Sequence, residues 1–194
     1  MPPPVSQVDS PAGSASVPVA GTAVELRAGD GIRSIPIGET GEIWVRGPQV
    51  TDGYHREPEL AAEQFRDGWL RTGDLGRMDE ADNLFIVGGA KDMIIYKGYN
   101  VYPAHLEEIL GVNPSVARSA VVGIPQPEVG ETPVAFVVPV GSALSGDALA
   151  SELVDHVRER VAPYQRSRAV HFVDELPLSP TGKVLIRAVP DLLR

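Results

Sequence analysis

Short runs of alternating apolar and polar residues, separated by glycines, fill the first half of the chain. Residues 22–27 alternate and a Gly-Asp-Gly turn follows them, while residues 42–46 form another strand-length segment between two bracketing glycines. Alternation with a period of two is typical of a half-buried β-strand. Residues 84–87 are apolar without interruption, which predicts a more deeply buried strand. We therefore expect residues 21–90 to form a small antiparallel sheet or barrel.

Two segments of this half do not alternate. Residues 57–66 have a proline near their start, early acids and an apolar side, which predicts a short helix. Residues 67–76 contain three glycines, which predicts turns around a strand. Asp74 follows Gly73 in this stretch and is expected on an exposed loop.

Strand-length apolar runs and helical periodicity alternate in the second half of the chain. Strands are expected at residues 93–96, 116–124, 134–138 and 169–173. Residues 103–111 begin with proline and end with glycine, which predicts a compact helix. Ser145 is a candidate cap for a second helix that runs to about Val161, with leucines and valines four residues apart. Residues 125–131 are polar and rich in proline and are expected to form a loop, whereas the apolar tail after Lys183 is compatible with helix.

These elements predict an α+β chain with three parts. Residues 1–20, rich in Pro, Ser, Ala and Val, are expected to form an irregular arm. Residues 21–90 form the small antiparallel β part, and residues 91–194 form an α+β domain whose central sheet packs against two to three helices. The β part is small and has many strand edges, so it is not expected to be comfortably stable by itself.

Composition excludes several classes of site. The chain has 194 residues, 43% of them apolar, and a formal net charge of -9, which argues against binding to nucleic acid or to an anionic membrane surface. It has no cysteine, which excludes disulfides and Cys-ligated zinc. The four histidines are scattered without metal-ligand spacing, so no metal site is expected. No run is long enough for a membrane helix and the start lacks a signal segment, so a cytoplasmic protein is expected.

The stretch 177–183 carries the strongest candidate chemistry. Two prolines and Gly182 favour a tight turn whose backbone is restricted, and the turn ends in Lys183. A flexible ammonium on a stiff loop suits the stabilisation of a phosphate or a carboxylate. Taken alone, the stretch is better explained as a surface turn before a C-terminal helix. Asp74 has two interpretations as well: an ordinary turn aspartate, or a carboxylate that accepts from two neighbouring hydroxyls such as a ribose diol.

Three stretches in a fixed order are more specific than any one of them. Residues 69–75 (WLRTGDL), 91–103 (KDMIIYKGYNVYP) and 178–183 (LSPTGK) resemble the adenylate-forming superfamily, which includes acyl- and aryl-CoA synthetases, firefly luciferase and the adenylation domains of peptide synthetases. The similarity extends to residues 41–48 and covers roughly residues 20–194. The second stretch is most similar to the CoA-ligase branch.

The resemblance also implies a missing part. Enzymes of this kind have a large N-terminal domain with a Ser/Thr/Gly-rich phosphate loop that ends in Pro-Lys-Gly, and no such loop occurs in this sequence. The chain is therefore expected to be the C-terminal portion of a ligase. Residues 21–90 would be the β-rich end of the N-terminal domain, and residues 91–194 the mobile small domain.

The resemblance assigns roles to individual residues. Lys183 would bridge the carboxylate and the phosphate during adenylate formation, and Asp74 would bind the ribose hydroxyls. Lys91 falls at the hinge position, where two preceding glycines agree with a swivel. Gly98 and Tyr99 match the loop that lines the CoA channel. The implied substrates are ATP with Mg²⁺, a carboxylic acid, and either CoA or the phosphopantetheine of a carrier protein.

One position departs from the family. The superfamily usually has arginine two residues before the hinge, near the nucleotide, and this chain has Gly89 there. Either Arg71 or another cation substitutes, or ATP binding is weaker, or this copy has lost catalysis. Three functions therefore remain open: a ligase fragment that is inactive without its N-terminal domain, a free-standing docking or regulatory module, and a degenerate remnant.

Overall fold

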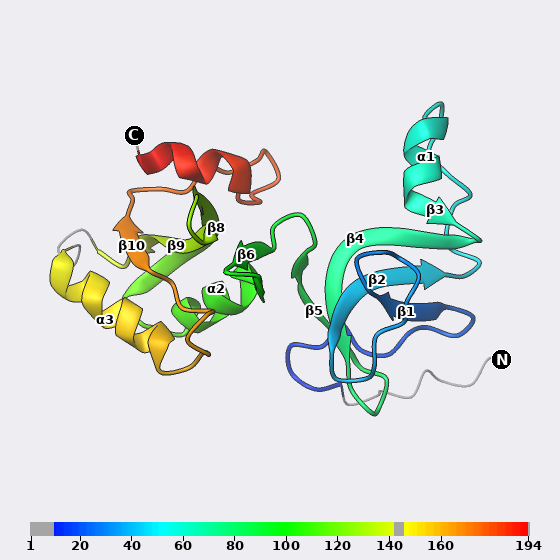
Figure 1. Ribbon diagram of the computed structural model, residues 1–194, viewed down its shortest axis with the longest axis horizontal. Coiled ribbons are helices and arrows are strands. Elements are labelled where there is room, and N and C mark those ends of the chain that lie inside the picture. Colours follow the sequence, from blue (N-terminus) through cyan, green and yellow to red (C-terminus); the bar gives the residue numbers. More distant parts are fainter. Residues whose placement is uncertain (1–9, 142–145, 194) are drawn as a thin grey trace. The chain divides into compact units, whose positions relative to one another are not determined.

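The chain forms two compact units, Met1–Ala90 and Lys91–Arg194 (Figure 1). The structure is a computed structural model that describes residues 10–141 and 146–193. Residues 1–9 of the expected arm, and Ser145 with its expected capping role, lie outside the described residues.

A five-stranded antiparallel sheet makes up most of the first unit. Its strands run in the order β1-β2-β4-β3, and β5 also pairs with β4. The elements are β1 (Ala23–Arg27), β2 (Thr40–Arg46), α1 (Pro58–Gln64), β3 (Phe65–Arg66), β4 (Trp69–Met78) and β5 (Leu84–Gly89). Its buried apolar side chains are Leu26, Ile43, Trp44, Trp69 and Leu75. The antiparallel β part expected from the alternating runs is confirmed.

The turn expected at Gly68 is confirmed, because residues 67–68 connect β3 to β4, whereas the turns expected at Gly73 and Gly76 are wrong, because β4 continues for 10 residues from Trp69. Its glycines serve the sheet instead. Gly73 has φ +79°, and a Cβ on Gly76 would lie 2.8 Å from the Ile43 side chain. A missing side chain thus allows close packing here without ending the strand. Asp74 consequently lies in a strand and not on a loop, although it is exposed.

The second unit is built on a mixed sheet in the order β10-β9-β6-β7, with β8 paired to β9. Pairing is antiparallel except between β10 and β9, which are parallel. The elements are β6 (Ile94–Tyr96), β7 (Tyr99–Val101), α2 (Pro103–Gly111), β8 (Val116–Gln126), β9 (Gly130–Pro139), α3 (Asp147–Arg158), β10 (Ala169–Phe172) and a 3₁₀ helix, η1 (Ile186–Leu193). The α+β class expected from the sequence is confirmed.

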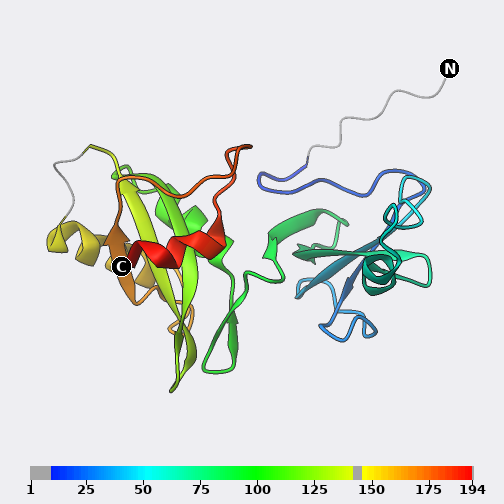
Figure 2. The ribbon, with the colours of Figure 1, turned by 90° about the horizontal axis from the view of Figure 1, so that it is seen from above.

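Both faces of the β8–β9 hairpin are covered (Figures 1 and 2). On one face Val121, Ala135 and Val137 pack with apolar residues of α2 and α3. On the other face Val122, Phe136 and their neighbours pack with Val189 of η1 and with Leu176. Because successive residues of a strand point to opposite faces, a strand covered on both sides must be apolar at nearly every position. This explains the continuous apolar run at 134–138 and the apolar residues at 120–122.

The loop expected at residues 125–131 is wrong in most of its length. The two strands stay paired as far as Gln126 and Gly130, so only residues 127–129 form the turn. This end of the hairpin has its own partners. The Lys97 N–H donates to the Val129 carbonyl at 2.7 Å, and the Ile95 N–H donates to the Glu131 carboxylate at 3.0 Å. The sequence pattern shows the prolines but not these partners from a distant strand.

Two helix ends also differ from expectation. Helix α3 ends at Arg158, short of the expected Val161. The tail after Lys183 forms a 3₁₀ helix with Pro190 inside it. Proline has no N–H to donate and its ring crowds the preceding turn, so a regular α-helix is disfavoured there.

Glu107 of α2 occupies a half-buried position beside β8. Its carboxylate accepts from the Val121 N–H at 2.8 Å, on the edge of β8 with which no other strand of the described residues pairs. Burial raises the pKa of Glu107, and the nearby Asp92 raises it further, while the Val121 hydrogen bond acts in the opposite direction. The folded protein therefore holds this proton more tightly than the unfolded chain does.

We predict that Glu107→Gln changes how stability depends on pH. With a raised pKa in the folded state, wild-type stability falls as pH rises from the unfolded carboxyl value toward the folded one. Glutamine can still accept from Val121 but does not ionise, so the variant should be more stable than wild type at neutral pH and lose that advantage in acid. Urea unfolding between pH 4 and pH 8 measures this, with Glu108→Gln as an exposed control on the same helix. Curves for wild type and Glu107→Gln that run parallel across this range would contradict the assignment.

Candidate functional site

Hydrogen bonds close the loop that carries Lys183. The Ser179 N–H donates to the Lys183 carbonyl at 2.7 Å, and the Gly182 N–H donates back to the Ser179 carbonyl at 2.9 Å. The Lys183 N–H donates to the Ser179 hydroxyl at 3.1 Å. Leu178 and Val184 form an antiparallel bridge at the base of the loop. Gly182 has φ +80°, a conformation that glycine adopts without strain. The backbone of the loop is therefore fixed at both ends and across its middle.

The Lys183 side chain lies on the exposed surface of this loop. The residue is exposed, and the structure records no ion pair for its ammonium with the residues it describes. Below the loop, Leu176 and Val189 are buried in the core of the second unit, at 5% and 0% exposure. The Lys183 ammonium can therefore contact a ligand without disturbing the buried residues on either side of the loop.

Asp74 lies directly opposite Gly89 in the sheet of the first unit. The two residues are partners in the β4–β5 register. Thr72 fixes the strand next to Asp74, because its hydroxyl accepts from the Asp74 N–H at 3.1 Å and donates to the Ile43 carbonyl at 2.8 Å. Directly opposed residues have Cβ atoms about 5 Å apart. An arginine at position 89 would therefore lie beside the Asp74 carboxylate.

Arg71 is already engaged by the protein. Its Nε donates to the Glu42 carboxylate at 2.7 Å, and Glu42 is only 4% exposed. The hydrogen bond to Glu42 raises the pKa of Arg71. Arg71 also lines a cavity of about 170 Å³ together with Trp44 and Asp30. Its role in binding nucleotide stays a prediction, and part of its guanidinium is committed to neutralising a buried carboxylate.

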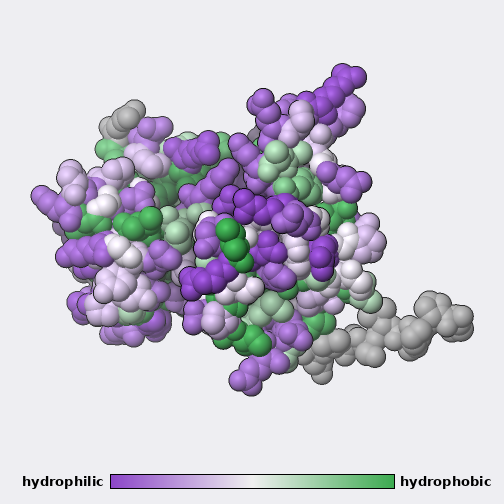
Figure 3. Space-filling view, turned by 45° about the vertical axis from the view of Figure 1, so that its right-hand side comes forward, coloured by the Kyte–Doolittle hydropathy of each residue, from purple (hydrophilic) through white to green (hydrophobic). Residues whose placement is uncertain are grey.

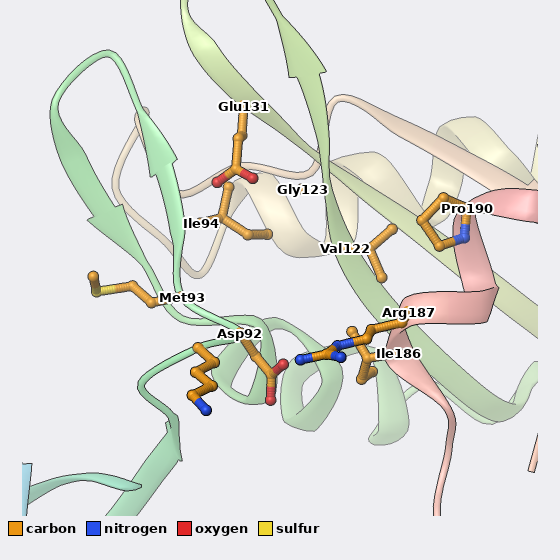
Figure 4. Close-up of a pocket in the computed structure, with 10 residues that line it drawn as sticks. Asp92, Met93, Ile94, Val122, Gly123, Glu131, Ile186, Arg187 and Pro190 are labelled. Carbon is orange, nitrogen blue, oxygen red and sulfur yellow. The ribbon is translucent and has the colours of Figure 1, made fainter. Parts of the chain in front are cut away.

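Lys91 is the first residue of the second unit and lines a cavity of about 210 Å³ within that unit (Figure 4). The other walls come from the residues just after it, from β8 and β9, and from η1. These lining residues are Asp92, Met93, Ile94, Val122, Gly123, Glu131, Ile186, Arg187 and Pro190. The cavity thus connects the candidate hinge with the helix that follows the Lys183 loop.

Gly98 and Tyr99 lie at the tip of the β6–β7 hairpin. Lys97 and Gly98 both have positive φ, 51° and 80°, as a two-residue hairpin turn requires. A Cβ on Gly98 would meet no atom within 4 Å, so the glycine leaves open space at this point. Tyr99 is 57% exposed and stacks on Tyr164, with ring centres 4.7 Å apart. This stack presents a flat aromatic surface beside the open glycine.

Three contributors were missed by sequence reasoning: Glu42, Tyr164 and Arg187. Glu42 could have been suspected, because it is an acid within a strand that is otherwise mostly buried. Tyr164 and Arg187 gave no signal, because the stack of Tyr164 on Tyr99 and the position of Arg187 in the cavity wall both depend on segments distant in the sequence.

The surface and the ionisable groups restrict the chemistry further. On the face shown in Figure 3, hydrophobic residues form separate small patches among hydrophilic ones. Across residues 10–141 and 146–193, no group of three or more His, Cys, Asp or Glu side chains could hold a metal ion. No helix in the same residues is long and apolar enough to cross a membrane.

Comparison with known proteins gives consistent matches. Residues 105–183 match the family described as AMP-binding enzyme C-terminal domain. The chain is 42% identical over 179 residues to a long-chain-fatty-acid–CoA ligase of Yersinia pestis. This match covers 92% of this chain and 31% of that protein. It is 44% identical over 174 residues to a feruloyl-CoA synthase of an Amycolatopsis species, covering 89% of this chain and 34% of that protein.

A solved structure agrees with these sequence matches. ATP-bound MatB from Rhodopseudomonas palustris superposes with a TM-score of 0.82 at 33% identity, covering 94% of this chain and 35% of that chain. The chain therefore spans about a third of the length of the curated relatives that it matches.

We predict that Arg71→Ala destabilises the first unit. The substitution leaves the buried Glu42 carboxylate without its cation, which costs about 1–3 kcal/mol of unfolding free energy. Chemical denaturation measures the loss. The double variant Glu42→Gln/Arg71→Ala removes the charge together with its partner and should recover part of it. An Arg71→Ala protein as stable as wild type would show that the ion pair does not support the fold.

Proposed function

Because this chain belongs to the adenylate-forming enzymes, and residues 105–183 are those of an AMP-binding enzyme C-terminal domain, we propose that it is the C-terminal part of an ATP-dependent carboxylic acid:CoA ligase. The reaction has two halves. A carboxylate oxygen attacks the α-phosphorus of ATP and expels pyrophosphate, which gives an acyl-adenylate. The thiol of CoA, or of a carrier protein's phosphopantetheine, then attacks the acyl carbon, releases AMP and gives the thioester.

The observation that carries this proposal is the exposed Lys183 ammonium on its closed loop. In the first half-reaction two anions, the carboxylate and the phosphate, must approach each other. A cation between them lowers the repulsion most where water is scarce, and a fixed backbone means that little reorganisation is needed. The acid pocket and the phosphate loop would come from the N-terminal ligase domain, so the chain by itself is expected to be inactive.

The remaining candidate residues fit supporting roles in the same reaction. Asp74 would accept hydrogen bonds from the ribose hydroxyls, because its carboxylate is exposed in a strand that Thr72 fixes. Lys91, at the first position of the second unit, would be the hinge about which that unit turns between the half-reactions. Gly98 and Tyr99 would line the CoA channel, since the glycine leaves open space beside an exposed ring.

The cosubstrate would be ATP, with Mg²⁺ bound to the nucleotide, and the reaction would take place in the cytoplasm. Relatives are named for a long-chain fatty acid and for an aromatic acid, so both classes belong in the first substrate panel. Fatty acid metabolism is the setting that the long-chain relative suggests.

We predict that Lys183→Ala separates the two half-reactions. In the chain joined to its N-terminal ligase domain, adenylate formation should fall by a factor of about 10²–10³, because the lost ammonium acts only in that step. Thioester formation from supplied acyl-adenylate should be kept. Pyrophosphate release and thioester formation are measured separately, with Arg118→Ala as an exposed cationic control. Equal loss in both halves would refute the role assigned to Lys183.

We predict that Gly89→Arg strengthens the use of ATP. Gly89 has no positive φ and faces Asp74 across the sheet, so an arginine fits the backbone and places a guanidinium near the nucleotide. The KM for ATP should fall by about tenfold, the size of one hydrogen bond to a charged group. Gly89→Gln is the neutral control. A KM unchanged by the arginine would mean that another cation already fills this role, while activity that appears only in Gly89→Arg would identify the natural chain as a catalytic remnant.

A further inference from the structure

The cavity at the start of the second unit contains an arrangement of charges that the proposed reaction has not used. Lys91, Asp92, Glu131 and Arg187 all line it. Figure 4 shows the Asp92 carboxylate and the Arg187 guanidinium pointing toward each other between the hinge segment and η1. Glu131 is already engaged by the Ile95 N–H at 3.0 Å. Of the two acids that line the cavity, Asp92 is therefore the one that can pair with Arg187.

Arg187 belongs to a helix that is firmly attached to the Lys183 loop. The Leu185 N–H donates to the Pro177 carbonyl at 2.8 Å, and the Ala188 N–H donates to the Leu185 carbonyl at 2.8 Å. Val189, two residues after Arg187, is fully buried. An interaction that fixes the Arg187 side chain therefore also restrains the backbone of the Lys183 loop, which is only a few residues away.

Asp92 is equally close to a fixed part of the unit. It lies next to the candidate hinge Lys91, and Ile94, two residues further, is 1% exposed. Its charge is felt by Glu107 of α2, where it disfavours ionisation. Asp92 and Glu107 are both acidic, so a cation beside Asp92 offsets the repulsion between the two carboxylates.

We propose that Asp92 and Arg187 are positioning residues that pair across this cavity and hold the Lys183 loop in place relative to the first residues of the second unit. The two side chains are exposed, and the structure records no direct ion pair between them. We expect them to pair through a change of rotamer or through one bridging water. Lys91 is the competing cation for Asp92, and Glu131, the other acid of the lining, accepts from the Ile95 N–H.

The catalytic consequence of this pairing rests on the proposed function. If Lys183 acts only in adenylate formation, the position of its loop relative to the hinge matters in that half-reaction alone. Loss of the pair should then slow adenylate formation several-fold more than thioester formation, which does not use Lys183.

The direct test measures hydrogen exchange of the chain itself and needs no activity. The amides of Gly182 and Lys183 report on the loop, because both are hydrogen-bonded within it. The amide of Phe136, in the buried strand β9, reports on global stability. In Asp92→Asn and in Arg187→Gln the loop amides should exchange about threefold faster, as expected for loss of one exposed ion pair. Phe136 should not change, and Arg118→Gln is the matched control of an exposed arginine.

The charge-reversed double variant Asp92→Arg/Arg187→Asp decides between pairing and a purely local effect. Restored opposite charges should return the loop amides to the wild-type exchange rate. Single variants that exchange at the wild-type rate, or a double variant that exchanges as fast as the singles, would overturn the proposal. The same variants in the chain joined to an N-terminal ligase domain then test the catalytic consequence. Altered exchange with no ligase activity in wild type would reject the proposed function and keep the pairing.

Discussion

The closed backbone beneath Lys183 is the constraint on which the account of this molecule depends. An ammonium stabilises the negative charge that develops during a reaction only if the protein holds the ammonium close to that charge. Here the loop is closed by hydrogen bonds through Ser179 and by the bridge between Leu178 and Val184. The side chain itself is left exposed and unpaired with the described residues. The loop backbone is therefore held by hydrogen bonds, while the end of the Lys183 side chain is exposed to solvent.

That loop is held by the sheet behind it. The β8–β9 hairpin is buried on both faces, by α2 and α3 on one side and by η1 with Leu176 on the other. Helix η1 follows the Lys183 loop directly, so the packing of Val189 fixes the loop as well as the core. The first unit offers a different kind of support. There a buried carboxylate, Glu42, accepts a hydrogen bond from Arg71. Asp74 is opposite Gly89 in the strand register, so no cationic side chain lies across from its carboxylate at that position.

Much of the fold could be predicted from the sequence, because period-two alternation and continuous apolar runs follow directly from burial on one or two faces. The strands around residues 22–27 and 134–138 are of this kind. Features that depend on distant partners could not be predicted. Strand β4 passes through its glycines because Ile43 packs against one of them, and the tip of the β8–β9 hairpin stays ordered because Lys97 and Ile95 bind it.

The candidate site divides in the same way. Motif order picked out Lys183, Asp74, Lys91, Gly98 and Tyr99, and their local geometry is compatible with the assigned roles. The sequence could not indicate that Arg71 is engaged by Glu42, or that Tyr99 stacks on Tyr164, since each of these contacts joins segments that only folding brings together.

The central claim is that this chain supplies the Lys183 cation to an active centre completed by a large N-terminal ligase domain. The most direct measurement is ATP–pyrophosphate exchange with a panel of carboxylic acids, comparing three proteins: this chain alone, an N-terminal ligase domain alone, and the two joined. The account predicts acid-dependent exchange in the joined protein far above the sum of the separate parts. Exchange by the chain alone, or a joined protein no more active than the N-terminal domain alone, would contradict it.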